Sequence, residues 1–148
     1  MPKIERTAEI SWDGNLARGA GAMSGGSGAF SQLGYTLATR IGQPEGKTSP
    51  EELLAAAHGG CLTMSLAGEL TGRETPPGHL QVTCTIVMDE VEGRGHQIVA
   101  SHVQIAATAE GLDEAGLQDA VAKADEGCPF SQLLRQAGAE VHVSAHLA

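Results

Sequence analysis

Apolar and polar positions alternate along the first part of the chain, which is the pattern of β-strands with one face in a core. The first alternation runs from Ile4 to Trp12, and Asp13-Gly14 after it is a hairpin-type turn. Further strands are predicted over 16–23 and 30–39, because a glycine-rich segment separates them. The N-terminal part therefore predicts a small group of three strands.

A long buried helix is predicted next, after a polar loop over 42–48. Ser49 suits the N-cap, Pro50 suits the first helical position, and a glutamate follows three residues after the cap, which completes a capping box. Apolar residues between 53 and 70 surround most of the circumference of this helix, and a helix that is apolar nearly all round is buried. We therefore place it at the centre of the fold.

A hairpin of two strands, two helices and a last strand follow. The hairpin turn is Gly93-Arg94-Gly95, the helical period begins at Asp113, and Cys128-Pro129 starts a short helix that ends near Gln136. The predicted inward positions are Leu80, Val82, Cys84, Ile86 and Met88; Val99, Val103, Ile105 and Ala107; Leu117, Ala120, Val121 and Ala124; Leu133 and Leu134; and Val141, Val143 and Ala145. Because the strands come in hairpins, the fold class is α+β with antiparallel sheet.

The length and charge of the chain narrow the function classes. With 148 residues, 41% of them apolar, the chain fits a single domain over 1–148. The net charge is -9 and the basic residues are scattered, so we expect no nucleic-acid partner and no binding to an anionic membrane. No apolar leader follows Met1, and the longest uncharged stretch in the apolar middle of the chain, 53–68, is too short and too polar to span a bilayer. We expect a cytoplasmic protein.

Three cysteines are the candidates for chemistry, since a reducing compartment favours thiol chemistry, metal binding or simple burial over a disulfide framework. Cys84 is in phase with the apolar face of its strand and is interpreted as a small buried side chain. Cys61 lies in the middle of the buried helix, where packing alone explains a cysteine. Cys128 lies at a helix start, where free N–H groups and the helix dipole favour a thiolate.

Metal and cofactor sites are not predicted. The sequence has no C-x-x-C, no H-E-x-x-H and no glycine-rich nucleotide motif. His142 and His146 share a face of the last strand, but no further ligand type converges on them. We therefore expect neither a bound metal nor a cofactor.

Two motifs around the cysteines resemble the OsmC/Ohr family. The segment 48–61, TSPEELLAAAHGGC, resembles the central-helix signature of that family, and 127–132, GCPFSQ, resembles its second-cysteine motif. The 66 residues between the two cysteines, the Ser11-Trp12-Asp13-Gly14 strand end and the element order also fit, so the resemblance spans nearly the whole chain. His58 and the Ser-Gln pair after Phe130 look more like the OsmC branch than the Ohr branch.

This resemblance implies an intertwined homodimer, in which antiparallel sheets wrap around long central helices and two active sites form where the subunits meet. By motif position, Cys61 is the peroxidatic nucleophile and Cys128 is the resolving cysteine, while Arg40 and Glu51 complete the site. Arg40 is chosen because it is expected in the loop after the third strand, as in the OsmC branch. Arg18 is the alternative, because it lies nearer to the place where the Ohr branch carries its arginine. The helix start by itself favours Cys128 as the more acidic thiol. The assignment of Cys61 as the nucleophile therefore depends on the resemblance and on the expected contact with Arg40.

The activity that the resemblance implies is the reduction of organic hydroperoxides. This reaction needs a thiolate, and only about 3% of a thiol with an ordinary pKa near 8.5 is ionised at pH 7. Arg40 would lower that pKa, and Glu51 would hold Arg40 in place. The sulfenic acid of Cys61 would condense with Cys128, and an external dithiol, which the resemblance suggests is of lipoyl type, would restore both thiols. The apolar central helix would line a pocket for alkyl or fatty hydroperoxides.

Two other functions fit the same residues. One is thiol–disulfide exchange without peroxide specificity. The other is small-molecule binding in the apolar cleft of a dimer that keeps its cysteines reduced. Consumption of a peroxide separates both from a peroxidase.

Overall fold

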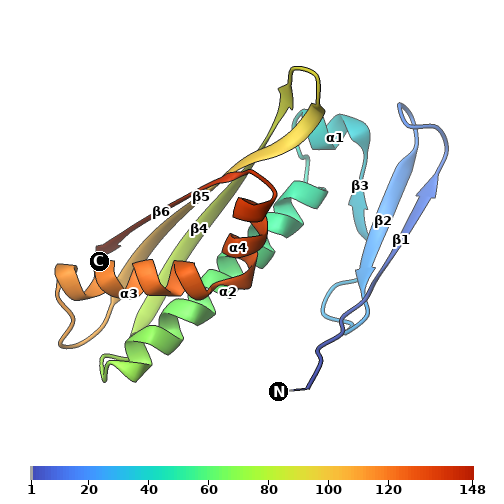
Figure 1. Cartoon of the computed structure of the whole chain (residues 1–148). Coiled ribbons are helices and arrows are strands. Elements are labelled where there is room, and N and C mark those ends of the chain that lie inside the picture. Colours follow the sequence, from blue (N-terminus) through green and yellow to red (C-terminus); the bar gives the residue numbers. More distant parts are fainter. Residues whose placement is uncertain (1) are drawn as a thin grey trace. The chain divides into compact units, whose positions relative to one another are not determined.

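The computed structural model describes residues 2–148, which form two compact units, residues up to Pro50 and Glu51–Ala148. Each unit has its own sheet of three strands (Figure 1). The elements in chain order are β1 (Ala8–Asp13), β2 (Ala20–Gly25), β3 (Leu33–Tyr35), α1 (Leu37–Ile41), α2 (Pro50–Gly72), β4 (His79–Val91), β5 (Gly95–Thr108), α3 (Glu114–Gly127), α4 (Pro129–Gln136) and β6 (Glu140–Leu147). This order confirms an α+β fold and adds one helix, α1, to the elements that the sequence predicted.

The first unit is an antiparallel sheet in the order β1-β2-β3, followed by α1. Its strands are shorter than predicted. The second begins only at Ala20, because a turn occupies the preceding residues, with Asn15 accepting hydrogen bonds from the N–H groups of Gly19 and Arg18. Trp12 packs edge-on against Tyr35, with ring centroids 5.5 Å apart, and fixes the face of this sheet.

The predicted third strand over 30–39 is wrong at both ends, since the strand spans only Leu33–Tyr35. Thr36 caps a helix there, since its side chain accepts a hydrogen bond from the N–H of Thr39 at 3.0 Å, and the Thr39 hydroxyl in turn bonds with the backbone N–H of Thr36. This capping box ends the strand at Tyr35 and starts α1. Arg40 therefore lies in the last turn of a short helix and not in a loop.

The second unit packs α2 and α3 against one face of the sheet β4-β5-β6 (Figure 1). Both predicted helix starts are confirmed, because α2 begins at Pro50 and Asp113 caps α3 through the N–H of Gly116. The core joins buried residues of α2, β5 and α3, namely Leu62, Leu66, Leu70, Val103, Ile105, Ala107, Leu117, Ala120, Val121 and Ala124. These residues are apolar at the spacing of their element, so the periodicity of the sequence accounts for the core.

Strand β6 runs parallel to β5, with Val103 opposite Val143, so this sheet is mixed and not purely antiparallel as predicted. The physical reason is the connection. The helices α3 and α4 carry the chain back along the sheet before β6 begins, which brings the new strand in with the direction of the previous one. Alternation along a strand is the same in either direction and does not reveal this.

Two predicted burials need correction. Leu133 was expected to point inward with Leu134, but Leu134 is buried while Leu133 is 57% exposed. Neighbouring helical positions point about 100° apart, so a short helix lying on a surface buries one of them. The helix α2 is also buried on one side only, since Met64 on the opposite side is 78% exposed. In the residues described, no helix combines the length and apolar character that crossing a membrane requires.

Candidate active site

Cys128 is held between two helices. It ends α3, where its N–H bonds with the carbonyl of Asp125 at 3.3 Å, and it is the N-cap of α4, where its carbonyl accepts the N–H of Gln132 at 3.0 Å. Pro129 follows at the first position of α4, as predicted. The side chain of Cys128 is fully buried in the core of the second unit. Backbone hydrogen bonds on both sides of the residue hold its position.

Cys61 lies near the middle of α2, close enough to Cys128 for that thiol to raise the pKa of its own. The fold thus brings together the two cysteines that the motifs selected, although 66 residues separate them in the sequence. Both are present as thiols. Cys61 is partly exposed and Cys128 is buried, so an incoming reagent meets Cys61 first.

The surroundings of Cys61 act on its pKa in opposite directions. Burial raises the pKa of the Cys61 thiol, and so does the neighbouring Cys128. The backbone N–H of Phe130 and the hydroxyl of Ser65 stabilise the thiolate and lower the pKa, but the net shift is upward. On balance, the contacts of Cys61 raise the pKa of its thiol, which disfavours the thiolate.

A backbone N–H group at the start of α4 acts on the thiol of Cys61, although the N-cap residue of that helix is Cys128. Within the described residues, the side chain of Cys128 makes no capping hydrogen bond to α4, whereas the N–H of Phe130 in the first turn interacts with Cys61. This corrects the local argument made from the sequence, which gave the benefit of the helix start to Cys128. A residue beside a helix N-terminus in space can use its N–H groups even when it is distant in sequence.

A buried histidine lies next to the two cysteines. The Nδ1 atom of His58 is 2.7 Å from the hydroxyl of Ser101, and its Nε2 atom is 2.8 Å from the hydroxyl of Ser131. All three side chains are 0% exposed. Burial lowers the pKa of His58, an effect that Asp125 opposes and Arg135 reinforces, so the ring is neutral at pH 7 and one nitrogen donates while the other accepts.

Cys84 belongs to the edge of the same polar group. Its sulfur lies 3.3 Å from the Ser101 hydroxyl and 3.8 Å from Nδ1 of His58, and it packs against the core while staying partly exposed. The prediction of a small buried side chain is therefore right for its packing and incomplete for its polar contacts. Gly59 allows this approach, because a Cβ there would come within 3.1 Å of the Cβ of Cys84.

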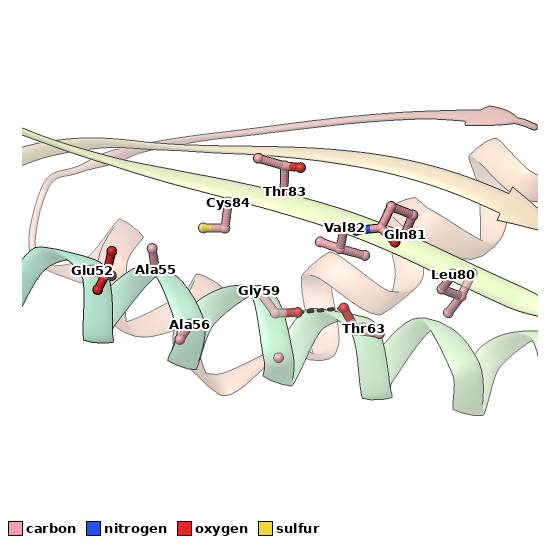
Figure 2. A pocket seen from close by; sticks show the side chains of 11 residues that line it. Glu52, Ala55, Ala56, Gly59, Thr63, Leu80, Gln81, Val82, Thr83 and Cys84 are labelled. Carbon is pink, nitrogen blue, oxygen red and sulfur yellow. Dashed lines mark hydrogen bonds between the residues drawn. The ribbon is translucent and has the colours of Figure 1, made fainter. Parts of the chain in front are cut away.

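A groove of about 550 Å³ runs between α2 and β4, with Cys84 in its wall (Figure 2). Glu52 and Ala55 lie at one end of the groove and Leu80 at the other, and the side chain of Thr63 bonds back to the carbonyl of Gly59 (Figure 2). Neither Cys61 nor Cys128 lines it. The groove is therefore distinct from the thiol pair.

The remaining predicted site residues lie elsewhere in the chain. Glu51 is in the first turn of α2, Arg40 is in α1, and Arg18 is in the turn between β1 and β2. Both arginines belong to the first unit and both cysteines to the second, so the approach of an arginine to Cys61 stays a prediction.

The sequence interpretation missed the hydrogen-bonded group of His58, Ser101 and Ser131. Two signals were available. Ser101 is in phase with the apolar face of β5, where a polar residue needs a buried partner. His58 precedes Cys61 by three residues and Ser131 follows Cys128 by three, so each shares a helix face with its cysteine.

Comparison with known proteins agrees with this geometry. Residues 42–144 match the family model of the OsmC-like proteins. The chain is 32% identical to the protein named peroxiredoxin OsmC of Escherichia coli (strain K12) over 132 residues, which covers 89% of this chain and 91% of that protein.

Solved structures show the same fold. An organic hydroperoxide resistance protein OsmC from Legionella pneumophila is 22% identical, with a TM-score of 0.70 and 99% of both chains covered. An OsmC-like protein of unknown function from Vibrio cholerae is 13% identical, with a TM-score of 0.78, and the match covers 97% of this chain and all of that one. The family model and the Escherichia coli relative, together with this shared fold, show that the chain belongs to the OsmC/Ohr family.

Proposed function

We propose that this protein is a peroxidase that reduces organic hydroperoxides to alcohols through Cys61 and Cys128. The observation that carries the proposal is that the fold brings these two thiols near enough for Cys128 to raise the pKa of Cys61, with Cys61 partly exposed and Cys128 buried. The names of the relatives support it, since one is called a peroxiredoxin and the Legionella protein an organic hydroperoxide resistance protein.

The reaction takes two steps at these sulfurs. The thiolate of Cys61 attacks one oxygen of the hydroperoxide, the O–O bond breaks, and the alkoxide that leaves takes a proton to become the alcohol. Cys61 is then a sulfenic acid. The sulfur of Cys128 attacks it, the S–O bond breaks, and the hydroxide leaves as water with the proton of the Cys128 thiol, giving the disulfide. An external dithiol, of lipoyl type in our proposal, reduces the disulfide by exchange.

Activation of Cys61 needs a cation, because burial raises the pKa of its thiol. We assign this role to Arg40, with Glu51 as the carboxylate that holds it, since a guanidinium stays charged when buried and binds a carboxylate through two hydrogen bonds. Arg18 is the alternative cation. No metal ion or organic cofactor takes part in this mechanism.

The working form in this proposal is a homodimer in the cytoplasm, each subunit one OsmC-like domain over 1–148. The side of α2 opposite the core supports it. Every fourth residue along that side is exposed, and these residues are small or apolar after the first turn: Ala56, Gly60, Met64 and Gly68. A second copy of α2 would bury this stripe and would complete the central pair of helices.

The test is a peroxide-consumption assay that depends on a dithiol. We expect turnover with cumene hydroperoxide and dihydrolipoamide, and slower turnover with hydrogen peroxide. Loss of activity in Cys61→Ser confirms that the thiol is responsible. A protein that forms the disulfide with glutathione disulfide but consumes no peroxide would instead be a thiol–disulfide exchange protein, and one that does neither would be a binding protein.

A further inference from the structure

Two contacts join α2 to the first turn of α4, and they are one helical turn apart. In α2, His58 precedes Cys61 by three residues, and in α4, Ser131 follows Cys128 by three. His58 bonds to Ser131 at 2.8 Å, and Cys61 lies near enough to Cys128 for the two thiols to interact electrostatically. Residues three apart share a helix face, so the histidine contact and the thiol contact are neighbouring links between the same two helices.

We propose that the His58–Ser131 hydrogen bond positions Cys128 for attack on the sulfenic acid of Cys61, which makes His58 and Ser131 positioning residues for disulfide formation. This inference rests on the proposed function of the thiol pair and adds to it. It assigns the two residues to the second step of the reaction and not to the attack on peroxide.

The hydrogen bond is suited to hold a fixed distance. Both partners are 0% exposed, so water cannot replace the contact if it breaks. The other nitrogen of the ring is 2.7 Å from the hydroxyl of Ser101 in β5, so the imidazole lies between the sheet and α4. The ring therefore ties three elements together, β5, α2 and α4.

Disulfide formation, the second step, depends on the position of α4, because Cys128 is the N-cap residue of that helix. That helix has eight residues, with Leu134 as its buried apolar anchor and an ion pair from Arg135 to Asp125 at its far end. Near Cys128, the link through Ser131 is the buried polar contact to α2. A disulfide tolerates a narrow range of Cα separations, about 4.4 to 6.8 Å, so a small shift of α4 slows bond formation. Cys61 lies on a helix of 23 residues whose placement does not require Ser131.

The chain offers a matched pair of variants. Ser131→Ala and Ser101→Ala each remove one fully buried hydroxyl that bonds to one nitrogen of His58. They differ in which element is released, α4 or β5. Each variant is oxidised with one equivalent of cumene hydroperoxide. Loss of the Cys128 thiol measures disulfide formation, because the first oxidation consumes only the thiol of Cys61, and trapping by dimedone measures the sulfenic acid of Cys61.

We expect Ser131→Ala to form the disulfide about tenfold more slowly, to accumulate trapped sulfenic acid, and to undergo the first oxidation at the wild-type rate within about twofold. Ser101→Ala should form the disulfide near the wild-type rate. His58→Gln, which keeps a polar atom near the position of Nε2, should form it faster than His58→Leu. Wild-type resolution in Ser131→Ala, or equal slowing in both serine variants, overturns the proposal.

A second measurement separates this inference from the proposed function. The Cys61–Cys128 disulfide is equilibrated with glutathione, which needs no peroxide. Ser131→Ala should destabilise the disulfide about tenfold relative to wild type, about 30 mV in reduction potential, and Ser101→Ala should not. If the wild-type protein fails to react with peroxide, the peroxidase proposal fails while this equilibrium still tests the positioning role. An unchanged potential in Ser131→Ala counts against it.

Discussion

The backbone N–H of Phe130 interacts with Cys61 and lowers the pKa of its thiol, although Cys128 is the N-cap residue of α4. The helix start of one thiol therefore stabilises the thiolate of the other. Burial outweighs this effect and keeps the pKa of Cys61 raised overall. The arrangement supports Cys61 as the nucleophile in our proposal, and it requires further positive charge beside it.

The roles of the two cysteines can be separated by substitution. We expect Cys61→Ser to abolish oxidation by cumene hydroperoxide, because the remaining Cys128 is buried. Cys128→Ser should react once and stop at the sulfenic acid of Cys61, since no thiol resolves it. Stopped-flow measurement with one equivalent of peroxide checks both. If Cys61→Ser is oxidised rapidly and Cys128→Ser does not react, Cys128 is the nucleophile and the assignment of the two roles is reversed.

Oxidation should link Cys61 to Cys128 and leave Cys84 as a thiol. The polar contacts of the Cys84 sulfur are with Ser101 and His58. Peptide mapping after peroxide treatment identifies the bridge, and Cys84→Ser serves as the control that should keep full turnover. A bridge to Cys84 in the wild-type protein contradicts the pairing.

The first oxidation should depend on pH in a defined direction. A raised pKa means that the thiolate of Cys61 forms only as the pH increases, so the rate should increase with pH across the neutral range. If Arg40 supplies the cation, Arg40→Ala shifts this increase to higher pH and lowers the rate at pH 7 about tenfold or more. Arg18→Ala is the matched control. If Arg18→Ala slows the first oxidation and Arg40→Ala does not, the activating cation is Arg18.

Dimer formation should depend on the exposed side of α2. Met64→Glu places a charge in the stripe that a second α2 would cover, and we expect it to shift the protein to monomers at micromolar concentration. Leu133→Glu is the control, because Leu133 is an exposed leucine of the short helix α4 and lies outside this stripe. Sedimentation velocity measures both. A wild-type protein that sediments as a folded monomer disproves the dimer.

Stability should fall on mild acidification because of His58. Burial lowers its pKa in the folded protein, whereas the unfolded chain binds a proton as the pH falls through about 6.5. The unfolded state then holds more protons, so the free energy of unfolding decreases as the pH falls below about 6.5 and continues to decrease down to the folded pKa. Urea titrations at pH 7.5 and 5.5 should show less of this loss in His58→Gln. The exposed His96→Gln should behave like the wild type.

Helix boundaries were the part of the fold best predicted from the sequence. Pro50 and Asp113 mark helix starts through local capping, which depends only on neighbouring residues. The parallel pairing of β6 and the capping box at Thr36 escaped prediction for different reasons. The first depends on the path of a connection, and the second lies within a segment whose pattern also fits a strand.

The two cysteines of the candidate site came from motifs, while the residues around them depend on contacts between distant segments. His58 and Ser131 are 73 residues apart, and in the sequence only their equal spacing from the two cysteines connects them. The amide of Phe130 is a backbone group, so no choice of side chain marks it. Periodicity finds which side of an element is buried, but it does not say which polar groups meet there.

The parallel strand β6 has a consequence for how a new chain matures. Cys61 leaves the ribosome 67 residues before Cys128, which corresponds to roughly 3 to 13 seconds of synthesis. During that time the inward side of α2 lacks α3, which supplies part of its core. Contacts between distant segments form slowly, and β6 can join the sheet only after α3 and α4 have crossed it. A newly made chain therefore acquires its thiol pair late, and the closeness of Cys61 and Cys128 is itself a sign that folding is complete.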